Sequence, residues 1–128
     1  MILADSTVWI DLLRGSGRGR EFSQLLRDGA ALVATEPVLM EVLAGARSDE
    51  EYDRIRNLVT SVSWLSLDPA SDFEAAAFIY SHCRALGVTP RGMVDCLIAA
   101  VALRAECHLM SSDRDFVEMA RVLPLRLM

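Results

Sequence analysis

The chain has 128 residues, a formal net charge of −5, and a composition that is 52% hydrophobic but only 6% aromatic. This length fits a single domain, whose aliphatic core would bury about two thirds of the surface of the unfolded chain. No apolar run approaches the ~18 residues of a membrane helix, and no basic segment precedes a long apolar one, so we expect a cytoplasmic protein without membrane attachment. The negative charge argues against a nucleic-acid partner, unless bound cations cancel part of it.

Short apolar runs alternate with longer segments of helical period, which is typical of a parallel sheet with crossover helices. In chain order we expect a strand at 2–5, helices at 7–14 and 21–27, a strand at 30–34, helices at 37–46 and 48–57, a strand at 62–67, helices at 69–86 and 93–104, a strand at 107–111, a helix at 114–120 and a strand at 125–127. Residues 15–19 form a glycine-rich loop. The expected fold is one α/β domain with a central parallel sheet of about five strands.

The basic residues and the cysteines bear on phosphate binding, disulfide bonds and zinc binding. All thirteen basic residues are arginines, whose planar guanidinium suits phosphate recognition, although codon bias in a GC-rich genome explains the pattern equally well. Cys83, Cys96 and Cys107 are odd in number and have no paired spacing, so we interpret them as reduced core thiols and expect neither a disulfide framework nor a zinc site.

Four carboxylates stand alone in otherwise apolar stretches, and they are Asp5, Glu41, Asp95 and Asp113. Removing an ionised carboxylate from water is unfavourable, so repeated placement of acids among core-forming residues requires compensation. A shared cation would provide it, because Mg²⁺ and similar ions are bound by carboxylate oxygens. The pattern therefore predicts a metal site.

The predicted elements bring these acids toward one edge of the sheet. Asp5 ends the first strand and Asp113 follows the fourth, which places both at the carboxyl edge where open parallel sheets bind ligands. Asp5 is also a candidate N-cap for the helix that follows it. Asp95 is alone in a very apolar helix, and Glu41 has no arginine at helical spacing. Asp115 competes with Asp113: one would bind the cation while the other caps the helix at 114–120.

Arginines near that edge are the candidates for substrate binding. Arg14, Arg18 and Arg20 cluster around the glycine-rich loop, and Arg91 precedes the helix of Asp95. Each could hold an RNA phosphate, although solvation explains each one taken singly as well. Asp11 is expected to be an ordinary surface acid.

Four segments together resemble the PIN-domain ribonucleases and, among them, the VapC toxins of toxin–antitoxin pairs. They are Ile2–Ile10 with Asp5, Glu36–Gly45 with Glu41, Gly87–Ala100 with Asp95, and Ser111–Phe116 with Asp113. The resemblance covers nearly the whole chain, and it implies a PIN-like three-layer α/β/α sandwich as a single domain over residues 1–128.

The resemblance also implies roles for individual residues. The catalytic and metal-binding quartet would be Asp5, Glu41, Asp95 and Asp113, with Asp115 as a substitute for Asp113. Ser6 would be the small hydroxyl residue that follows the first acid, and we include it among the candidate substrate-binding residues. Ser111 stands where the family's fourth motif commonly has threonine, which keeps the hydroxyl group.

The implied reaction agrees with the chemistry of the residues. Carboxylate oxygens suit Mg²⁺ or Mn²⁺, which can activate a water molecule for attack on a phosphodiester. The expected enzyme is an endoribonuclease that cuts RNA, with tRNA or rRNA as the expected class, leaves a 5′-phosphate and a 3′-hydroxyl, and so inhibits translation.

The same resemblance implies protein partners. A small VapB-type antitoxin would occupy the site and present an arginine to the acids, a pairing that carboxylates favour. The toxin itself would form a homodimer, for which the exposed apolar positions of the helices at 37–46 and 50–58 are the candidates.

Two alternatives come from other functional classes. A PIN-like module could bind RNA without cutting it, as happens when the acids are lost, but all four positions are intact here. A phosphorelay receiver domain would share the alternating fold, but it needs a lysine, which this chain lacks, and an acidic neighbour for Asp5, which is also missing.

Overall fold

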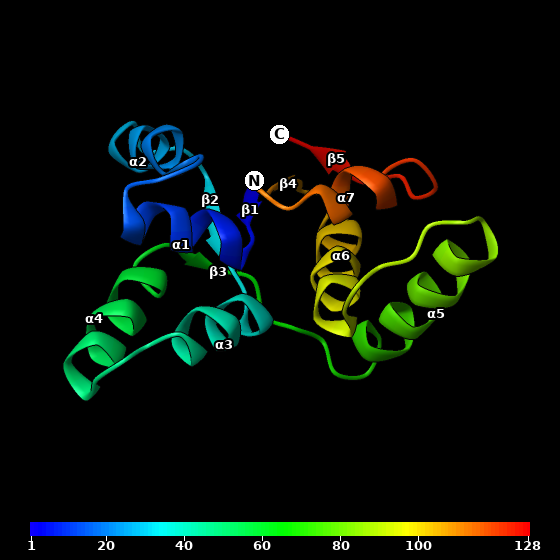
Figure 1. Ribbon diagram of the computed structural model, residues 1–128, viewed down its shortest axis with the longest axis horizontal. Coiled ribbons are helices and arrows are strands. Elements are labelled where there is room, and N and C mark those ends of the chain that lie inside the picture. The colour runs from blue at the N-terminus through cyan, green and yellow to red at the C-terminus, as the bar shows by residue number, and fades with distance from the viewer.

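Five short parallel strands form the centre of the protein (Figure 1). The computed structural model describes all of residues 1–128. The strands are β1 (Ile2–Ala4), β2 (Leu32–Ala34), β3 (Ser63–Trp64), β4 (His108–Met110) and β5 (Arg126–Leu127), in the order β3-β2-β1-β4-β5. β1 lies at the centre, where Ile2 pairs with Leu32 on one side and with His108 on the other. The expected parallel sheet is therefore confirmed.

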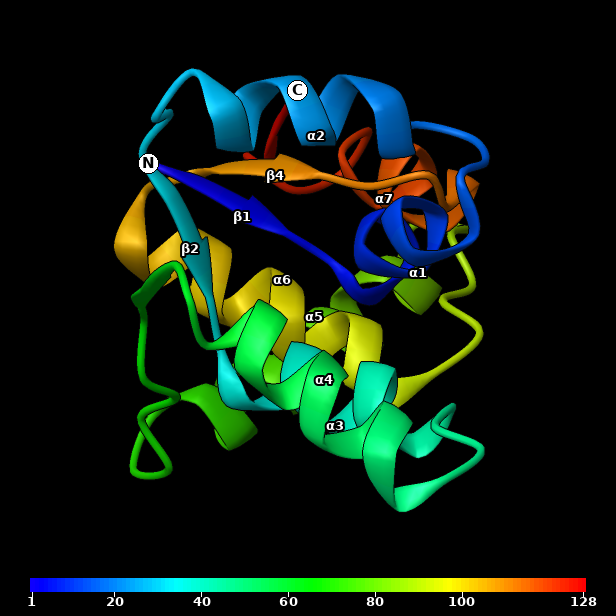
Figure 2. The same cartoon turned by 90° about the vertical axis from the view of Figure 1, so that its left-hand side faces the viewer.

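Seven helices surround the sheet. They are α1 (Ser6–Arg14), α2 (Gly19–Arg27), α3 (Glu36–Ala44), α4 (Asp49–Val59), α5 (Asp72–Ala85), α6 (Met93–Ala105) and α7 (Arg114–Met119). Figure 2 shows α2 on one side of the strands and α6 with α3, α4 and α5 on the other, while α1 and α7 lie near the ends where β1 and β4 finish. This arrangement is the expected three-layer α/β/α sandwich.

Polar side chains cap several of these helices, and Asp5 does so as predicted. Asp5 has an extended backbone, and its carboxylate accepts a hydrogen bond from the Val8 N–H at 3.3 Å. The Ser48 hydroxyl likewise accepts from the Glu51 N–H at 3.1 Å. These bonds satisfy backbone donors that the first turn of a helix leaves free, so each residue fixes where its helix starts.

The segment between β3 and α5 differs from the prediction, because β3 ends at Trp64 and α5 begins only at Asp72. The backbone N–H of Leu67 donates to the Glu36 carboxylate at 2.7 Å instead of continuing the sheet. Asp68 then starts a turn, in which its own N–H donates to the Asp72 carboxylate at 2.8 Å. Side-chain hydrogen bonds of this kind compete with regular secondary structure.

Asp72 is a buried acid with a structural role. It is 1% exposed, and the Arg104 guanidinium donates to both of its oxygens at 2.9 Å. Burial alone would raise the pKa of Asp72, but the hydrogen bonds from Arg104 bring it below its usual value. The pair joins α5 to α6 and meets the condition that a buried charge must be paired.

The core is aliphatic, with a single aromatic contact at its centre. Twenty-eight buried hydrophobic residues form one cluster, in which Trp9 meets Phe22 edge to face with ring centroids 4.7 Å apart. The three cysteines are buried and unpaired, as expected. None of the helices combines the length and the apolar character that crossing a bilayer requires.

Candidate active site

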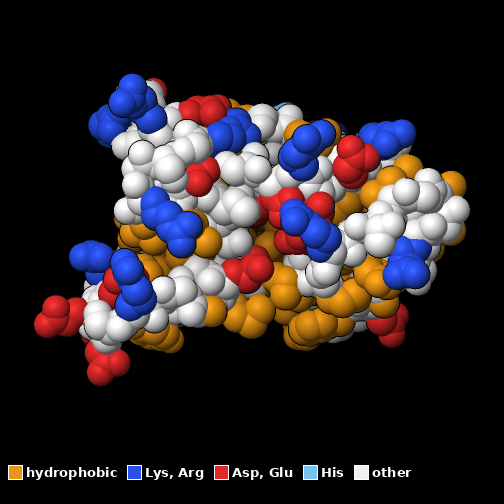
Figure 3. Space-filling model, viewed as in Figure 1, with side chains coloured by type: hydrophobic (Ala, Val, Ile, Leu, Met, Phe, Trp, Pro, Cys, Tyr) orange, Lys and Arg blue, Asp and Glu red, His pale blue; other side chains and the backbone are white.

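The predicted acids meet at the carboxyl end of the sheet. Asp5 directly follows β1, and Asp113 lies between β4 and α7. Asp95 is in the first turn of α6, and Glu41 lies in the second half of α3. In the space-filling view, acidic side chains gather over the middle of one face beside an arginine, with hydrophobic side chains below them (Figure 3).

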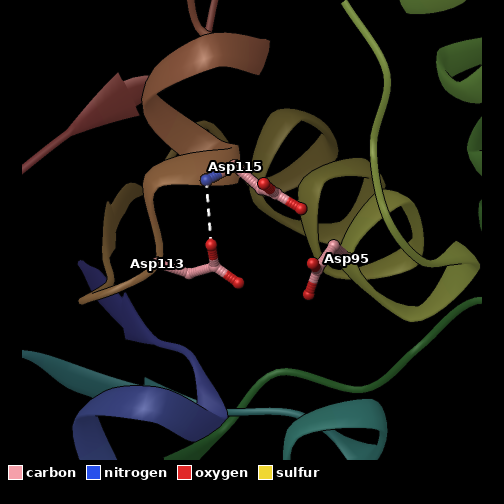
Figure 4. A group of neighbouring side chains, drawn as sticks. All are labelled: Asp95, Asp113 and Asp115. Carbon is pink, nitrogen blue, oxygen red and sulfur yellow. Dashed lines mark hydrogen bonds between the residues drawn. The ribbon is translucent and has the colours of Figure 1, made fainter.

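Asp95, Asp113 and Asp115 form the tightest group at this edge. Each offers a carboxylate oxygen, and these oxygens all lie within 4.8 Å of one another. Figure 4 shows the three side chains converging from α6 and from the start of α7. The structure therefore includes both Asp113 and Asp115 in the group, although the sequence analysis treats them as competitors for one position.

Asp113 also caps α7. Its Oδ1 accepts a hydrogen bond from the Asp115 N–H at 2.9 Å, drawn as the dashed line in Figure 4, while its other oxygen points toward Asp95. Because capping uses one oxygen only, the same carboxylate can hold the helix start and still face the acidic group. Capping thus leaves both Asp113 and Asp115 at the site.

Asp5 lies deeper than the other acids and is held by hydroxyl groups. It is 2% exposed; the Ser111 hydroxyl donates to its Oδ2 at 2.6 Å, and the Thr7 hydroxyl donates to its Oδ1 at 2.5 Å. Burial raises the pKa of Asp5, and the hydrogen bonds oppose that increase. Oδ1 also accepts from the Val8 N–H, whereas Oδ2 accepts only from Ser111 and keeps a second lone pair, so these bonds are compatible with cation binding through Oδ2.

Thr7 has no predicted role at the site, and Ser111 is predicted only as part of a motif. For Thr7 the available signal is its place two residues after a capping aspartate, where a hydroxyl can reach the carboxylate. For Ser111 the signal is the family's preference for a hydroxyl residue at that position. The contact of both hydroxyls with one buried acid depends on β1 and β4 being neighbours.

Ser6 has a different partner. It is 8% exposed, and its hydroxyl donates to Glu41 Oε1 at 3.0 Å. The bond joins the first turn of α1 to α3, two elements that are distant in the sequence. Ser6 therefore orients one of the predicted acids.

Asp95 is the acid of the site whose carboxylate has no hydrogen-bond donor or ion-pair partner. No hydrogen bond reaches its carboxylate, although the side chain is partly buried. Burial first, and then the negative charge of Asp113, raise the pKa of Asp95 to about 7. A partly buried carboxylate that lacks donors and faces two other carboxylates fits a hard divalent cation, since oxygen ligands are what Mg²⁺ and Mn²⁺ bind. The residues at this edge therefore suit the predicted ion.

The four candidate arginines differ in how far their side chains are engaged. Arg18 donates to Glu21 and to the carbonyl oxygens of Ser111 and Met128, which gives it a structural role. Arg91 is paired with acids of the site. Arg14 and Arg20 are exposed and make no ion pair.

Asp11 is not the solvated surface acid that the sequence analysis expects. Its carboxylate accepts from the Arg18 N–H at 3.1 Å and from the Ser112 hydroxyl at 2.6 Å. The glycine-rich loop packs against it so closely that a Cβ at Gly17 would lie 2.3 Å from Asp11 Oδ2. Asp11 thereby ties the loop before α2 to the segment after β4, which carries Asp113.

Comparison with known proteins shows that the chain belongs to the PIN-domain family, whose model matches residues 2–122. Within that family the chain belongs with the VapC ribonucleases. It is 40% identical over 129 aligned positions to ribonuclease VapC11 of Mycobacterium tuberculosis, and the match covers 98% of this chain and 96% of that protein.

Solved structures of more distant proteins share the fold. VapBC2 from Rickettsia felis, bound to a DNA fragment from its promoter, superposes with a TM-score of 0.76 at 16% identity and covers 100% of this chain and 98% of that one. VapC20 of Mycobacterium tuberculosis, a sarcin–ricin loop-cleaving toxin, gives 0.73 at 16% identity and covers 98% and 99%.

The raised pKa of Asp95 predicts a pH-dependent loss of stability in the metal-free protein. Between its ordinary value of 3.8 and about 7, the unfolded chain has lost a proton that the folded chain still holds. The unfolding free energy therefore falls as pH rises through this range and stays low above it. Because Asp95 is partly exposed, Asp95→Asn should recover only about 1–2 kcal/mol near neutral pH.

Thermal unfolding in EDTA at a series of pH values measures this effect. The melting temperature of Asp95→Asn should exceed that of the wild type at about pH 8 and match it at about pH 4. Asp53→Asn removes an exposed acid of α4 that makes no ion pair, and it should follow the wild type throughout. Equal melting curves for wild type and Asp95→Asn at the higher pH would contradict the prediction.

Proposed function

We propose that this chain is the toxin of a toxin–antitoxin pair and an endoribonuclease that hydrolyses RNA phosphodiester bonds with Mg²⁺ or Mn²⁺. The observation that carries the proposal is the convergence of Asp95, Asp113 and Asp115 at the carboxyl edge of a PIN fold. Its 40% identity to a VapC ribonuclease supports the same reaction. Cleavage of tRNA or rRNA would inhibit translation in the cytoplasm.

The proposed ligands are the four predicted acids, Asp5, Glu41, Asp95 and Asp113, and we add Asp115. When bound, the ion would lower the pKa of a water molecule for attack on the phosphodiester and stabilise charge on the leaving oxygen. Attack by water rather than by the ribose 2′-hydroxyl leaves a 5′-phosphate and a 3′-hydroxyl. No serine, cysteine or histidine nucleophile is needed.

Residues around the acids would keep them in position. Ser6 holds Glu41, and the hydroxyls of Thr7 and Ser111 hold Asp5. These bonds restrict the carboxylates before substrate arrives, and hydrogen-bond partners of metal ligands contribute in this way to metal affinity.

Phosphate binding is the role that we propose for the exposed arginines. Arg14 ends α1 and Arg20 lies in the first turn of α2, so both guanidinium groups are presented to solvent near the glycine-rich loop. Neither makes an ion pair that would have to break before it met RNA. Contacts of this kind position a nucleic acid without reading its sequence.

The proposed antitoxin would use a groove between α1, α3 and α4 as well as the acids of the site. This cavity of about 280 Å³ has Ile10 and Leu13 among its apolar residues, and its charged residues are three arginines and one acid: Arg14, Arg47, Arg54 and Glu51. Such a lining fits a segment with apolar and acidic side chains. An arginine of the same partner would pair with the acids of the site. The likeness of the fold to VapBC complexes supports a partner of this kind.

A homodimer is the proposed assembly. The two helices predicted to form its interface, α3 and α4, each expose one large apolar side chain. Met40 of α3 is 54% exposed and Tyr52 of α4 is 44% exposed. α5 exposes Phe73 and Phe78 to a similar or greater extent, so it is the other surface that a test must include.

Metal-dependent cleavage is the direct test of the proposed reaction. Purified protein should cut tRNA or rRNA with Mn²⁺ or Mg²⁺, leave 5′-phosphate ends and stop when EDTA is added. Asp5→Ala and Asp95→Ala should each lower the rate by about 100-fold or more while circular dichroism stays unchanged. Because both carboxylates lie in the group, Asp113→Ala and Asp115→Ala should each reduce the rate. Asp53→Ala is the control, and cleavage that persists in EDTA would refute the mechanism.

The proposed role of the groove in antitoxin binding can be tested by placing a charge in it. Leu13 is 39% exposed at the groove, and Leu13→Glu would place a charge where the apolar side chains of the antitoxin are expected. Co-purification with the small protein encoded beside the toxin should fall by at least about tenfold. Leu86→Glu adds the same charge at a position that is 56% exposed and outside the groove, and it should leave binding intact.

Light scattering after size exclusion tests the dimer and its surface. The wild type should have twice the 14.1 kDa mass of one chain, and Met40→Glu should reduce it to one chain by placing a charge in the interface. Phe78→Glu is the contrasting variant. If Phe78→Glu dissociates the dimer and Met40→Glu does not, the interface is formed by α5 rather than by α3.

A further inference from the structure

Arg91 occupies an unusual place for a largely exposed residue. Its side chain is 74% exposed, and it lies in the short loop before α6, four residues ahead of Asp95. From there it reaches across to the start of α7 and makes ion pairs with Asp113 at 2.8 Å and with Asp115 at 2.9 Å. One guanidinium therefore bridges two of the three carboxylates in the acidic group.

The donors from Arg91 fall on only one oxygen of each carboxylate. Its Nη2 donates to Asp113 Oδ1, which also accepts from the Asp115 N–H. Its Nε and its backbone N–H both donate to Asp115 Oδ2, at 2.9 and 3.2 Å. Two oxygens thus take two donors each, whereas Asp113 Oδ2 and Asp115 Oδ1 accept no hydrogen bond.

The choice of oxygens distinguishes two possible roles for Arg91, which are competition with the cation and positioning of the carboxylates. A guanidinium that competes with the cation would occupy the oxygens that face the centre of the group. In the structure, the oxygen of Asp113 that points toward Asp95 is the one that Arg91 leaves free (Figure 4). At Asp113, Arg91 therefore contacts the oxygen away from Asp95, and at Asp115 it leaves Oδ1 without a donor.

We propose that Arg91 is a positioning residue of the site, which holds Asp113 and Asp115 by one oxygen each so that their free oxygens, Asp113 Oδ2 and Asp115 Oδ1, bind the cation together with Asp95. The inference rests on the proposed metal-dependent reaction and assigns to Arg91 a role other than phosphate binding. Two carboxylates so close to each other and to Asp95 repel one another, and one bridging cationic side chain offsets that repulsion while fixing both rotamers.

The geometry requires arginine rather than any cation. Nε and Nη2 belong to one rigid plane and reach two different carboxylates at the same time. A lysine has the same charge, but its ammonium is a compact point charge on a flexible stem without this fork. Arg91→Lys therefore keeps the charge near the metal and removes the positioning.

Titration with Mn²⁺ in the absence of RNA, read from the electron paramagnetic resonance signal of the free ion, measures the effect without relying on activity. Arg91→Lys should weaken Mn²⁺ binding by about 10- to 100-fold, which is the usual range for residues that orient metal ligands. Arg121→Lys is the matched control: Arg121 is 70% exposed and pairs with Glu118 at 2.9 Å on the surface. It should bind Mn²⁺ as the wild type does.

The remaining outcomes separate this inference from the proposed function. If the wild type binds no Mn²⁺, the metal-dependent reaction fails, and the role of Arg91 fails with it. If the wild type binds Mn²⁺ and Arg91→Lys binds it as tightly, only the positioning role is overturned. A variant that binds Mn²⁺ normally but has a higher KM for RNA would make Arg91 a phosphate ligand. Tighter Mn²⁺ binding by Arg91→Gln would make Arg91 a competitor of the ion, and it too would overturn the inference.

Discussion

The site depends on one electrostatic constraint, which is the crowding of carboxylates at the carboxyl edge of the sheet. Elsewhere in the fold a buried acid has donors for both oxygens, as the Arg104 guanidinium provides for Asp72. Asp5 and Glu41 each receive hydroxyl donors. Asp95 receives none, and its burial beside other acids raises its pKa to about 7. A bound cation would offset the repulsion among these acids, which is the physical basis of the proposed function.

The fold brings the acids together through the order of its strands. β1 lies beside β4, so Asp5 after the first strand and Ser111 after the fourth become neighbours although they are 106 positions apart. Asp11 and Arg18 then tie the glycine-rich loop to the same segment after β4. These hydrogen bonds of Asp11 and Arg18 therefore hold the segment that leads into α7, where Asp113 lies.

Much of the site was predictable because it depends on local patterns. An acid alone in an apolar segment is recognisable in sequence, and Asp5 and Asp95 were identified in that way before their neighbours were known. The contact of the Thr7 hydroxyl with Asp5 and that of the Arg91 guanidinium with two acids are not predicted from the sequence, and the choice between Asp113 and Asp115 is left open there. Their roles depend on which oxygen each side chain reaches, and side-chain direction follows from loop and cap geometry rather than from spacing.

By itself the sequence determined the alternation of strands and helices, the isolation of four acids and the edge of the sheet at which two of them lie. Each of these follows from hydrophobic period and chain order, which are local properties. The tertiary structure alone decided that Asp113 caps α7 while still facing Asp95, that Asp115 belongs to the same group, and that Arg91 contacts one oxygen of each. Those outcomes are set by distances of a few ångströms between segments that only folding brings together.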